Sequence, residues 1–319
     1  MKILITGATG LVGTELTRLC EQQGIEVNYL TTSKQKLIKR EGYNGYLWNP
    51  DKGEIDLEAF KGVESIINLA GATVSKRWTP SYKKKIRSSR LDTLNTLRTG
   101  LSQADTSGIT SLVSASAIGI YKNSLTNFYT EDSTEISDDF LGDVVQDWEK
   151  AVDQIDGLGF KTAKVRIGLV LSMEGGALSE MVRPINYYAG AAFGSGQQWQ
   201  SWIHIQDLAR LLFFVATEGL EGTFNAVAPN PVTNTKLTRE IARVLRKPLI
   251  LPNIPRFAMR LLLGEMSELL FASQRVSSKK IEQSGFVFEY PNIGRALEKL
   301  LAKGTEEDSR KGQFTEEYV

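Results

Sequence analysis

The first thirteen residues constrain the fold of this chain more than any other stretch. A short apolar run at 2–6 is typical of a buried strand in a parallel sheet, and Gly7, Gly10 and Gly13 follow it at a spacing of three. The next residues have apolar side chains at helical spacing up to Gly24, a residue type that commonly ends helices. The chain is therefore predicted to begin with a strand, a tight glycine turn and a helix.

This order is the context in which a nucleotide-binding glycine motif is expected. Gly7 permits the tight turn, Gly10 lets the backbone approach a pyrophosphate, and Gly13 lets the helix pack closely on the strand. The N–H groups and the positive dipole end of the helix would then face phosphates. The spacing is G-x-x-G-x-x-G, and no Lys-Ser or Lys-Thr pair follows, which excludes a P-loop. The motif predicts a dinucleotide site; the alternative is a tight turn with a structural role alone.

Composition excludes several other classes of protein. The chain has 319 residues, of which 41% are hydrophobic and 24% charged, as in ordinary globular proteins. A formal net charge of +1 gives no general attraction to nucleic acid or to anionic membranes. The single cysteine, Cys20, is expected in the core and rules out a disulfide framework. The single histidine, His204, argues against a histidine metal centre or a Ser-His-Asp triad, so no metal is expected.

No secretion signal is expected, because the N-terminus already reads as the first strand. The apolar segment 257–271 is too short and too interrupted by charges to span a bilayer. We therefore expect a cytoplasmic monomer or homodimer that acts on a small molecule and has neither a nucleic acid nor a membrane as partner.

The first 170 residues alternate between strand-like and helix-like segments. The expected strands are 25–31, 64–69, 111–116 and 162–171, and the expected helices are 79–103 and 140–155. This rhythm predicts an α/β, Rossmann-like, doubly wound parallel sheet with its ligand at the carboxyl ends of the strands.

The second half of the chain has a different character. Segments 202–205 and 223–228 are expected to return to the sheet on either side of a helix at 207–217, and an aromatic strand is expected at 286–290 before a last helix ending near 302. The predicted domains are an NADP-binding domain at 1–229, with 172–202 as a substrate-side excursion, and a smaller, mainly helical substrate domain at 230–302. The polar segment 303–319 is expected to be a tail.

The end of the second strand indicates which dinucleotide is bound. An acidic residue there would hold the 2′-hydroxyl of NAD, but Thr31, Thr32, Ser33 and Lys34 include no carboxylate. Hydroxyl groups with a lysine favour the 2′-phosphate of NADP; the alternative is an ordinary polar turn. Arg90 lies in an apolar stripe of the 79–103 helix, where a cation needs a partner, and either reaches a cofactor phosphate or is a surface arginine.

Several motifs together resemble the extended short-chain dehydrogenase/reductases, and more closely the atypical "epimerase family protein" branch with its own small C-terminal domain. They are Thr6-Gly7-x-x-Gly10-x-x-Gly13, Asn68-Leu69-Ala70-Gly71, Lys76-Arg77-Trp78-Thr79, Ser88-Ser89-Arg90, Ser114-Ala115-Ser116-Ala117, Trp148-Glu149, Gly194-Ser195-Gly196-Gln197-Gln198 before Trp202-Ile203-His204, and Gly285-Phe286-x-Phe288-x-Tyr290-Pro291.

The resemblance implies a set of NADP contacts along the chain. Around the diphosphate it implies Gly7, Thr9, Gly10, Leu11 and Val12, with Gly13 in the same turn. It implies Thr31 and Thr32 at the ribose phosphate beside Ser33 and Lys34, Leu69 and Ala70 at the adenosine side with Gly71 next to them, Arg90 at a phosphate and Val170 near the nicotinamide.

The catalytic Tyr-x-x-x-Lys pair of the family that this chain resembles is missing from the sequence. Family members polarise the substrate with a Ser or Thr, a role that Ser116 fits, and transfer a proton with a Tyr-x-x-x-Lys pair. Leu141 and Val145 occupy the positions of that pair, and no tyrosine in the chain is followed four residues later by lysine. Tyr121 is a candidate substitute, although a packed aromatic is the alternative. Candidate substrate contacts are Arg77, Trp78, Gln197, Gln198 and Trp202.

Two functions remain open. The first is an NADP-dependent oxidoreductase or epimerase that acts on a carbonyl or sugar-nucleotide-like compound without the usual pair. The second is a non-catalytic NADP(H)-binding sensor or regulatory protein. The missing pair favours the second, whereas Ser116, Gln197 and Trp202 favour the first.

Overall fold

The fold is built on a parallel sheet that carries most of the chain's strands. The computed structural model describes residues 1–155 and 157–302. The strand order is β13-β9-β7-β6-β1-β2-β4-β3, and every neighbouring pair from β13 to β4 is parallel. The strands of this sheet are β1 (Lys2–Thr6), β2 (Glu26–Thr31), β3 (Lys39–Arg40), β4 (Tyr43–Asn49), β5 (Glu54–Ile55, which pairs with β4), β6 (Ser65–Asn68), β7 (Ser111–Ala117), β9 (Lys161–Ile167) and β13 (Gly222–Ala226).

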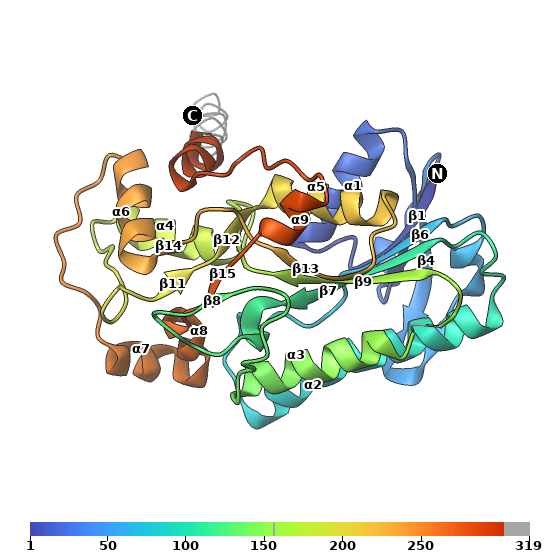
Figure 1. The fold of residues 1–319 in the computed structure, drawn as a ribbon, viewed down its shortest axis with the longest axis horizontal. Helices are drawn as coiled ribbons and strands as arrows, with labels where there is room; N and C mark the ends of the chain where they lie inside the picture. The colour runs from blue at the N-terminus through green and yellow to red at the C-terminus, as the bar shows by residue number, and fades with distance from the viewer. Residues whose placement is uncertain (156, 303–319) are drawn as a thin grey trace, which may run out of the picture.

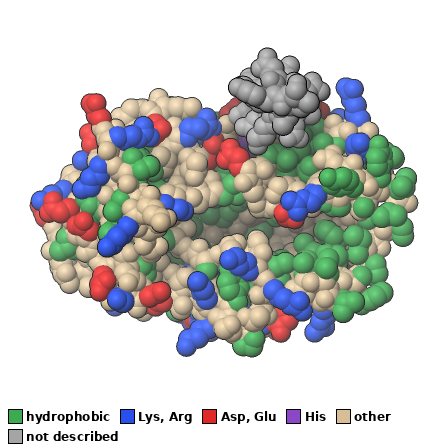
Figure 2. Space-filling view, turned by 180° about the vertical axis from the view of Figure 1, so that it is seen from behind, with side chains coloured by type: hydrophobic (Ala, Val, Ile, Leu, Met, Phe, Trp, Pro, Cys, Tyr) green, Lys and Arg blue, Asp and Glu red, His purple; other side chains and the backbone are tan. Residues whose placement is uncertain are grey.

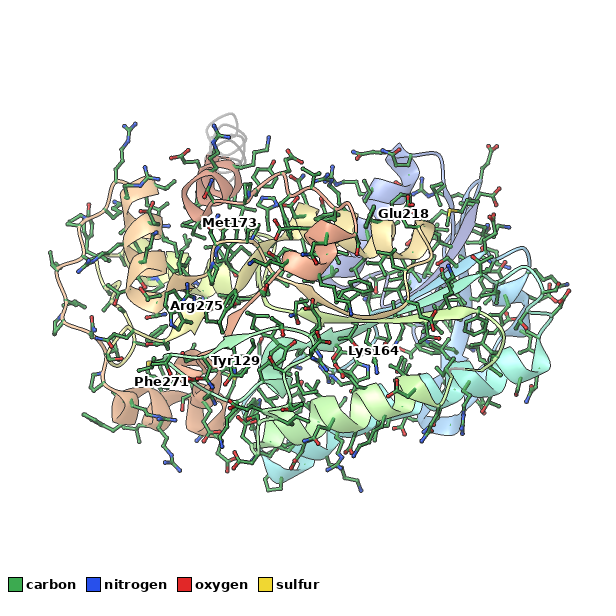
Figure 3. All side chains as sticks on the ribbon, in the orientation of Figure 1. Tyr129, Lys164, Met173, Glu218, Phe271 and Arg275 are labelled. Atoms are coloured by element: carbon green, nitrogen blue, oxygen red, sulfur yellow. The ribbon has the colours of Figure 1, made fainter. Side chains whose placement is uncertain are left out.

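Helices cover both faces of this sheet (Figure 1). On one face α1 (Leu11–Gln22) and α5 (Ile205–Thr217) bury residues such as Leu16 and Leu208 against β1 and β9. On the other face α2 (Pro80–Gln103) and α3 (Phe140–Asp153) bury Leu97 and Val152. Side chains fill the space between the layers (Figure 3). The predicted α/β doubly wound architecture is confirmed.

The order of the strands reverses beside β1. From β1 the chain proceeds to β2 and β4 on one side, and then returns to the other side as β6, β7, β9 and β13. The carboxyl ends of β1 and β6 are therefore followed by connections that run in opposite directions, which leaves a crevice at this edge of the sheet. Any ligand of the sheet is expected there.

The rest of the chain forms a smaller region beside the sheet, on the left in Figure 1. It contains three two-stranded sheets: β10 (Leu169–Leu171) with β12 (Trp202–His204), β11 (Trp199–Gln200) with β14 (Val232–Thr233), and β8 (Phe128–Tyr129) with β15 (Arg275–Val276). Its helices are α4 (Ala177–Asn186), α6 (Asn234–Val244), α7 (Arg256–Leu263), α8 (Glu268–Phe271) and a last helix at 293–302. The short helix α9 (Lys279–Gln283) instead lies over β13, where Ile281 joins the core of the central sheet.

Two predicted strands differ from those observed. The segment 162–171 is not one strand, because it breaks at Gly168 into β9 and β10. A Cβ atom on Gly168 would lie 2.3 Å from the Ser201 carbonyl oxygen, so only glycine allows the chain to turn there toward β12. The segment 202–205 consequently pairs with β10 and does not return to the central sheet; only β13 does.

The aromatic strand predicted at 286–290 is absent from the described chain. Its alternate side chains Phe286, Phe288 and Tyr290 are buried, as a strand pattern requires, but the backbone has a different partner. The N–H groups of Glu289 and Tyr290 donate to the Asp207 carboxylate of α5 at 2.9 and 2.8 Å. The buried Asp207 carboxylate thus accepts backbone hydrogen bonds that a neighbouring strand would accept in a sheet. The domain boundary near residue 230 stays a prediction, and the predicted tail at 303–319 lies outside the described residues.

Candidate functional site

The glycine turn after β1 is shaped by close backbone contacts. Gly7 has φ of +72°, a conformation that favours glycine, and a Cβ atom there would lie 2.9 Å from the Leu69 carbonyl carbon. A Cβ atom on Gly13 would lie 2.1 Å from the Gly7 oxygen, which confirms the close packing predicted for it. Gly10 is exposed, and its Cβ position meets only the Gly7 oxygen, at 3.3 Å. The open side of the turn is therefore at Gly10.

The start of α1 leaves donors available at this turn. Gly10 is the N-cap and has no side chain with which to accept from the first N–H groups of the helix. Leu11, Val12, Gly13 and Thr14 include no acidic residue that would neutralise the helix dipole. Backbone donors and positive dipole thus point toward the open side of the turn, the arrangement that suits a phosphate group.

Thr6 fixes the end of β6 beside the glycine turn. Its Oγ1 accepts from the N–H groups of Leu69 and Ala70, both at 3.1 Å, and donates to Asn68 Oδ1 at 2.6 Å. Asn68 in turn donates to Ser114 Oγ at 3.0 Å on the next strand. This row of buried side chains holds the predicted contacts Leu69, Ala70 and Gly71 at the crevice next to β1.

Arg90 reaches this edge from α2 and forms no ion pair with any carboxylate of the described residues. A Cβ atom on Gly71 would lie 3.4 Å from the Arg90 side chain, and the guanidinium stacks on Trp148, 4.8 Å from the ring centre. Its Nη1 donates to the carbonyl oxygens of Ala72 and Ile86. Burial lowers the pKa of Arg90 to about 10. Burial of the positively charged guanidinium costs solvation free energy, and the groups that accept its hydrogen bonds are neutral carbonyl oxygens.

The end of β2 provides further cations. Thr31 Oγ1 accepts from the Ser33 N–H at 3.2 Å, and exposed Thr32 and Lys34 follow. Sequence reasoning missed Lys36, whose Nζ donates to Thr9 Oγ1 of the glycine turn at 3.3 Å. The sequence could have indicated Lys36, because it lies two residues after Lys34, which was predicted to contact the cofactor. The buried Tyr29 hydroxyl anchors this segment, because it donates to the Lys36 carbonyl oxygen at 2.6 Å and accepts from the Ile38 N–H at 2.8 Å.

Val170 belongs to the apolar cluster that includes the start of α1. It belongs to β10, which the break at Gly168 carries away from the central sheet, and it packs in one apolar cluster with Leu11 and Val12 at the start of α1. The structure therefore gathers the predicted cofactor residues from the ends of β1, β2, β6 and β10 and from α2 at one edge of the sheet. Their contacts with a cofactor stay predictions.

Ser116 and Tyr121 lie in a buried polar network at the end of β7. Ser116 Oγ donates to Glu149 at 2.6 Å, and Arg166 donates to both Glu149 oxygens at 2.8 Å. Arg166 also donates to the Tyr121 hydroxyl, which itself donates to Asn225 Oδ1 at 2.7 Å. All five side chains are buried. Burial alone would raise the pKa of Glu149, but the hydrogen bonds and charge of Arg166 outweigh it and hold this pKa below its usual value.

This network gives both hydroxyl groups structural partners. Glu149 stands on α3 one turn beyond Val145, which with Leu141 occupies the positions of the usual catalytic pair. The catalytic roles of Ser116 and Tyr121 stay predictions, and their burial counts against them. Burial raises the pKa of Tyr121 above its usual range, which makes its phenol a poorer acid.

The predicted substrate residues are not gathered in one place. Trp202 is fully buried and donates to the Asn230 oxygen, and Trp78 is buried against Phe140, so burial counts against both as substrate contacts, and their assignment stays a prediction. Arg77 and Gln197 are exposed. Gln198 lines a cavity of about 420 Å³ with Asn123, Ser195, Arg256 and Phe271, among others, although its Nε2 is engaged by the Phe193 and Leu270 oxygens.

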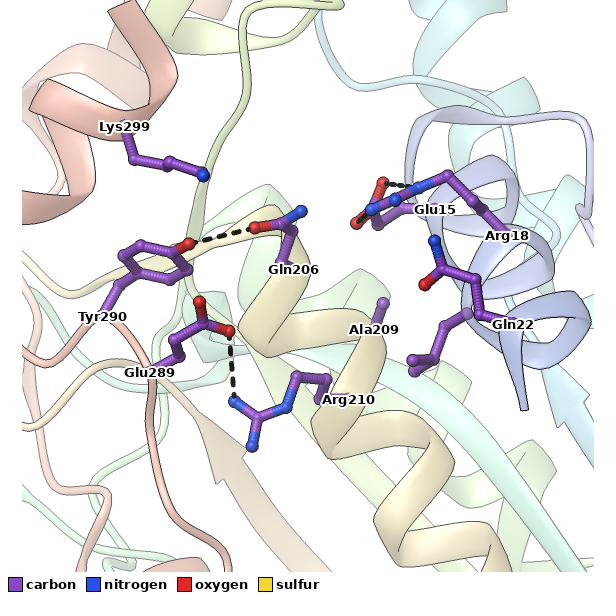
Figure 4. A pocket seen from close by; sticks show the side chains of 10 residues that line it. Glu15, Arg18, Gln22, Gln206, Ala209, Arg210, Glu289, Tyr290 and Lys299 are labelled. Atoms are coloured by element: carbon purple, nitrogen blue, oxygen red, sulfur yellow. Dashed lines mark hydrogen bonds and ion pairs between the residues drawn. The ribbon is translucent and has the colours of Figure 1, made fainter. Parts of the chain in front are cut away.

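A second cavity, of about 230 Å³, lies between α1 and α5, away from the strand ends (Figure 4). Its polar side chains pair with one another: Glu15 with Arg18, Gln206 with the Tyr290 hydroxyl, and Arg210 with Glu289. His204 stands nearby as the N-cap of α5, where Nδ1 accepts from the Gln206 N–H at 3.1 Å, and it stacks on Tyr290. The core position expected for Cys20 is confirmed.

Comparison with known proteins agrees with this architecture. The NAD dependent epimerase/dehydratase family matches residues 3–138, and a domain of unknown function (DUF1731) matches residues 254–300. An epimerase family protein of Staphylococcus aureus is 39% identical over 301 residues, which are 94% of this chain and 99% of the relative. The chain is an epimerase family protein. A Staphylococcus haemolyticus member is 37% identical over similar shares of both chains.

Solved structures of this epimerase family include a human member, epimerase family protein SDR39U1, in a crystal structure with NADPH. It is 28% identical, has a TM-score of 0.82, and the match covers 94% of this chain and 99% of the human chain. A nucleoside-diphosphate sugar epimerase from Corynebacterium glutamicum is 27% identical with a TM-score of 0.73, over 100% of this chain and 68% of its own. The predicted family, with its C-terminal domain, is confirmed.

Proposed function

We propose that this epimerase family protein binds NADP(H) at the edge formed by the ends of β1, β2 and β6. The single observation that carries the proposal is Arg90, a largely buried cation with no carboxylate partner in the described chain, stacked on Trp148 beside Gly71 at the end of β6. A cation in that position is compensated when an anion arrives. The human relative whose structure contains NADPH supports the choice of cofactor.

We further propose that Lys36 and Lys34 select NADP over NAD. Lys36 already contacts Thr9, so its ammonium group lies where the second strand and the glycine turn meet. In this fold the adenosine ribose lies at the end of the second strand, where a cation receives the 2′-phosphate. Thr32 and Ser33 add hydroxyl and N–H donors to this position.

The activity proposed is that of an oxidoreductase or epimerase acting on a carbonyl or sugar-nucleotide-like compound. NADPH, when bound, supplies a hydride, and the chain's own residues would orient the cofactor through the glycine turn and Arg90. Leu141 and Val145 carry no proton to exchange, so a proton donor other than the usual pair is required. The alternative is a non-catalytic NADP(H) sensor, and the burial of Ser116 and Tyr121 in the Arg166 network favours it.

Calorimetric titration tests the cofactor proposal. We expect NADPH to bind more tightly than NADH, and Lys36→Ala to weaken NADPH roughly tenfold while leaving NADH nearly unchanged, because only NADPH carries the 2′-phosphate. Lys52→Ala, at another exposed lysine, is the matched control. Equal affinity of the unaltered protein for both cofactors would contradict the assignment of the lysines.

A turnover assay separates the enzyme from the sensor. NADPH oxidation is followed across carbonyl compounds and sugar nucleotides, with Ser116→Ala compared with the unaltered protein. Turnover lost in Ser116→Ala with NADPH affinity retained would support the enzyme. NADPH binding without turnover on every compound in the panel would favour the sensor.

A further inference from the structure

The far end of the C-terminal region exposes an unusual amount of apolar surface. On α7, Phe257, Leu261 and Leu262 are 75%, 84% and 69% exposed, although large apolar side chains are normally buried. In the loop before α7, Ile250 and Leu251 are also exposed. Figure 2 shows hydrophobic side chains gathered at this end of the molecule, on the right of that view. We call this set of five side chains the α7 patch.

The stretch of chain that contains the α7 patch, 246–262, carries charges of one sign, whereas η5 (Gly264–Ser267), which packs against α7, carries Glu265. The stretch 246–262 contains Arg246, Lys247, Arg256 and Arg260 and neither aspartate nor glutamate, whereas the whole chain has 38 basic and 37 acidic residues. The nearest carboxylates along the chain are Glu240, paired with Arg243, and Glu265, paired with Lys83; exposed Glu268 lies beyond them. The net charge of the whole chain, +1, gave no reason to expect a membrane contact. It does not reveal the local excess of positive charge in 246–262.

Two exposed tyrosines, Tyr187 and Tyr188, lie at the end of α4. Lys247 Nζ lies 3.1 Å from the Tyr188 hydroxyl and 4.4 Å from the centre of its ring, which places the end of α4 beside the basic stretch. Tyr187 is 79% exposed. Tyrosine is enriched where one end of a side chain meets hydrocarbon and the other meets water and polar groups.

We propose that the α7 patch binds the surface of a membrane that contains anionic lipid. Exposed aliphatic and aromatic side chains on a short helix, bordered by arginine and lysine, match an interfacial segment that lies in the headgroup region without crossing the bilayer. Anionic headgroups complement the four cations of 246–262. No helix of the described chain is long and apolar enough to cross a membrane, and this contact requires none.

The same charges disfavour a second copy of the chain as the occupant. A two-fold interface is formed by the same surface of both subunits, so it would bring two copies of the 246–262 stretch together. Eight cations would then share a desolvated interface without a carboxylate from either stretch. Self-association through this patch would be opposed at low salt, whereas attraction to anionic lipid is strongest there.

Vesicle flotation tests the proposal with the full-length protein. Vesicles of phosphatidylcholine and phosphatidylserine at about three to one are compared with phosphatidylcholine alone, at low and high salt. We expect binding to the anionic vesicles only, weakened by salt. Absence of binding to anionic vesicles, or equal binding to both compositions, would overturn the proposal without need of a variant.

Matched variants then locate the contact. We expect Arg246→Ala with Arg260→Ala to weaken binding roughly thirtyfold, and Phe257→Ser with Leu261→Ser to abolish it. Lys52→Ala with Arg98→Ala, and Val287→Ser at another exposed apolar side chain, are the controls and should bind normally. Thermal unfolding confirms that each variant is folded. Unchanged binding of both double variants, or a dimer in light scattering that Leu261→Ser dissociates, would refute a lipid contact at this patch.

Discussion

Replacing Arg90 by methionine should affect cofactor binding and stability in different ways. Burial of the guanidinium lowers its pKa to about 10, and the difference from the usual value corresponds to about 3 kcal/mol at about 1.4 kcal/mol per pKa unit. Against this cost stand two hydrogen bonds to carbonyl oxygens and one stacking contact with Trp148, each worth about 1 kcal/mol. The two sums nearly cancel, so stability should change by less than about 1 kcal/mol.

Cofactor affinity should respond much more strongly. A guanidinium that donates to a phosphate contributes about 1.5–3 kcal/mol through charge-assisted hydrogen bonds, so Arg90→Met should weaken NADPH roughly tenfold to a hundredfold. Calorimetry measures the affinity, and denaturant unfolding without cofactor measures the stability. Methionine keeps the apolar stem that packs on Gly71, so little packing is lost.

Arg166→Met is the matched control, because Arg166 is also buried but holds a carboxylate. Its removal leaves Glu149 charged and unpaired, and stability should fall by about 3–5 kcal/mol. The reasoning about Arg90 is refuted if Arg90→Met destabilises the protein as much as Arg166→Met does and leaves NADPH affinity intact. Arg90 would then be a structural residue.

Three further predictions follow from single contacts. Gly13→Ala should lower the free energy of unfolding by more than about 2 kcal/mol, because its Cβ would lie 2.1 Å from the Gly7 oxygen, whereas Gly10→Ala should fold normally and bind NADPH less tightly; unfolding and titration measure both. The depressed pKa of Glu149 contributes stability at neutral pH that is lost as the pH falls below about 4 and through the folded-state pKa. Denaturation at a series of pH values should show this loss, and Glu149→Gln should flatten it. Burial raises the pKa of the Cys20 thiol to about 12, so thiol reagents should modify it only after unfolding, as mass spectrometry can follow.

The sequence predicted the central fold well, because its signals are local. Apolar strands, glycine at the first turn and the helical spacing of the 79–103 helix each depend on neighbours along the chain. The elements that were missed depend on distant partners. The break at Gly168 is fixed by the Ser201 oxygen, and the extended segment at 286–290 is fixed by Asp207 on α5. Neither contact can be predicted from the spacing of apolar and polar residues in the segment itself.

The candidate site divides in the same way. The glycine turn could be predicted from spacing, and the apolar surroundings of Arg90 indicated that it needs a partner, although its contact with a phosphate stays a prediction. The contact of Lys36 with Thr9 depends on how Tyr29 holds the segment after β2, and the network of Ser116 depends on Arg166 from the neighbouring strand. A serine at a strand end has the same appearance in the sequence whether its hydroxyl faces a cleft or a buried carboxylate.

The attachment of residues 287–290 to α5 bears on how this family could have diversified. Asp207 is fully buried, and its carboxylate receives two N–H groups that come from the C-terminal region. A chimaera that exchanged everything after residue 230 for another sequence would leave this carboxylate without donors unless the replacement restored them. We therefore expect such a chimaera to be less stable than the natural chain, because the C-terminal region and α5 share the buried Asp207 carboxylate.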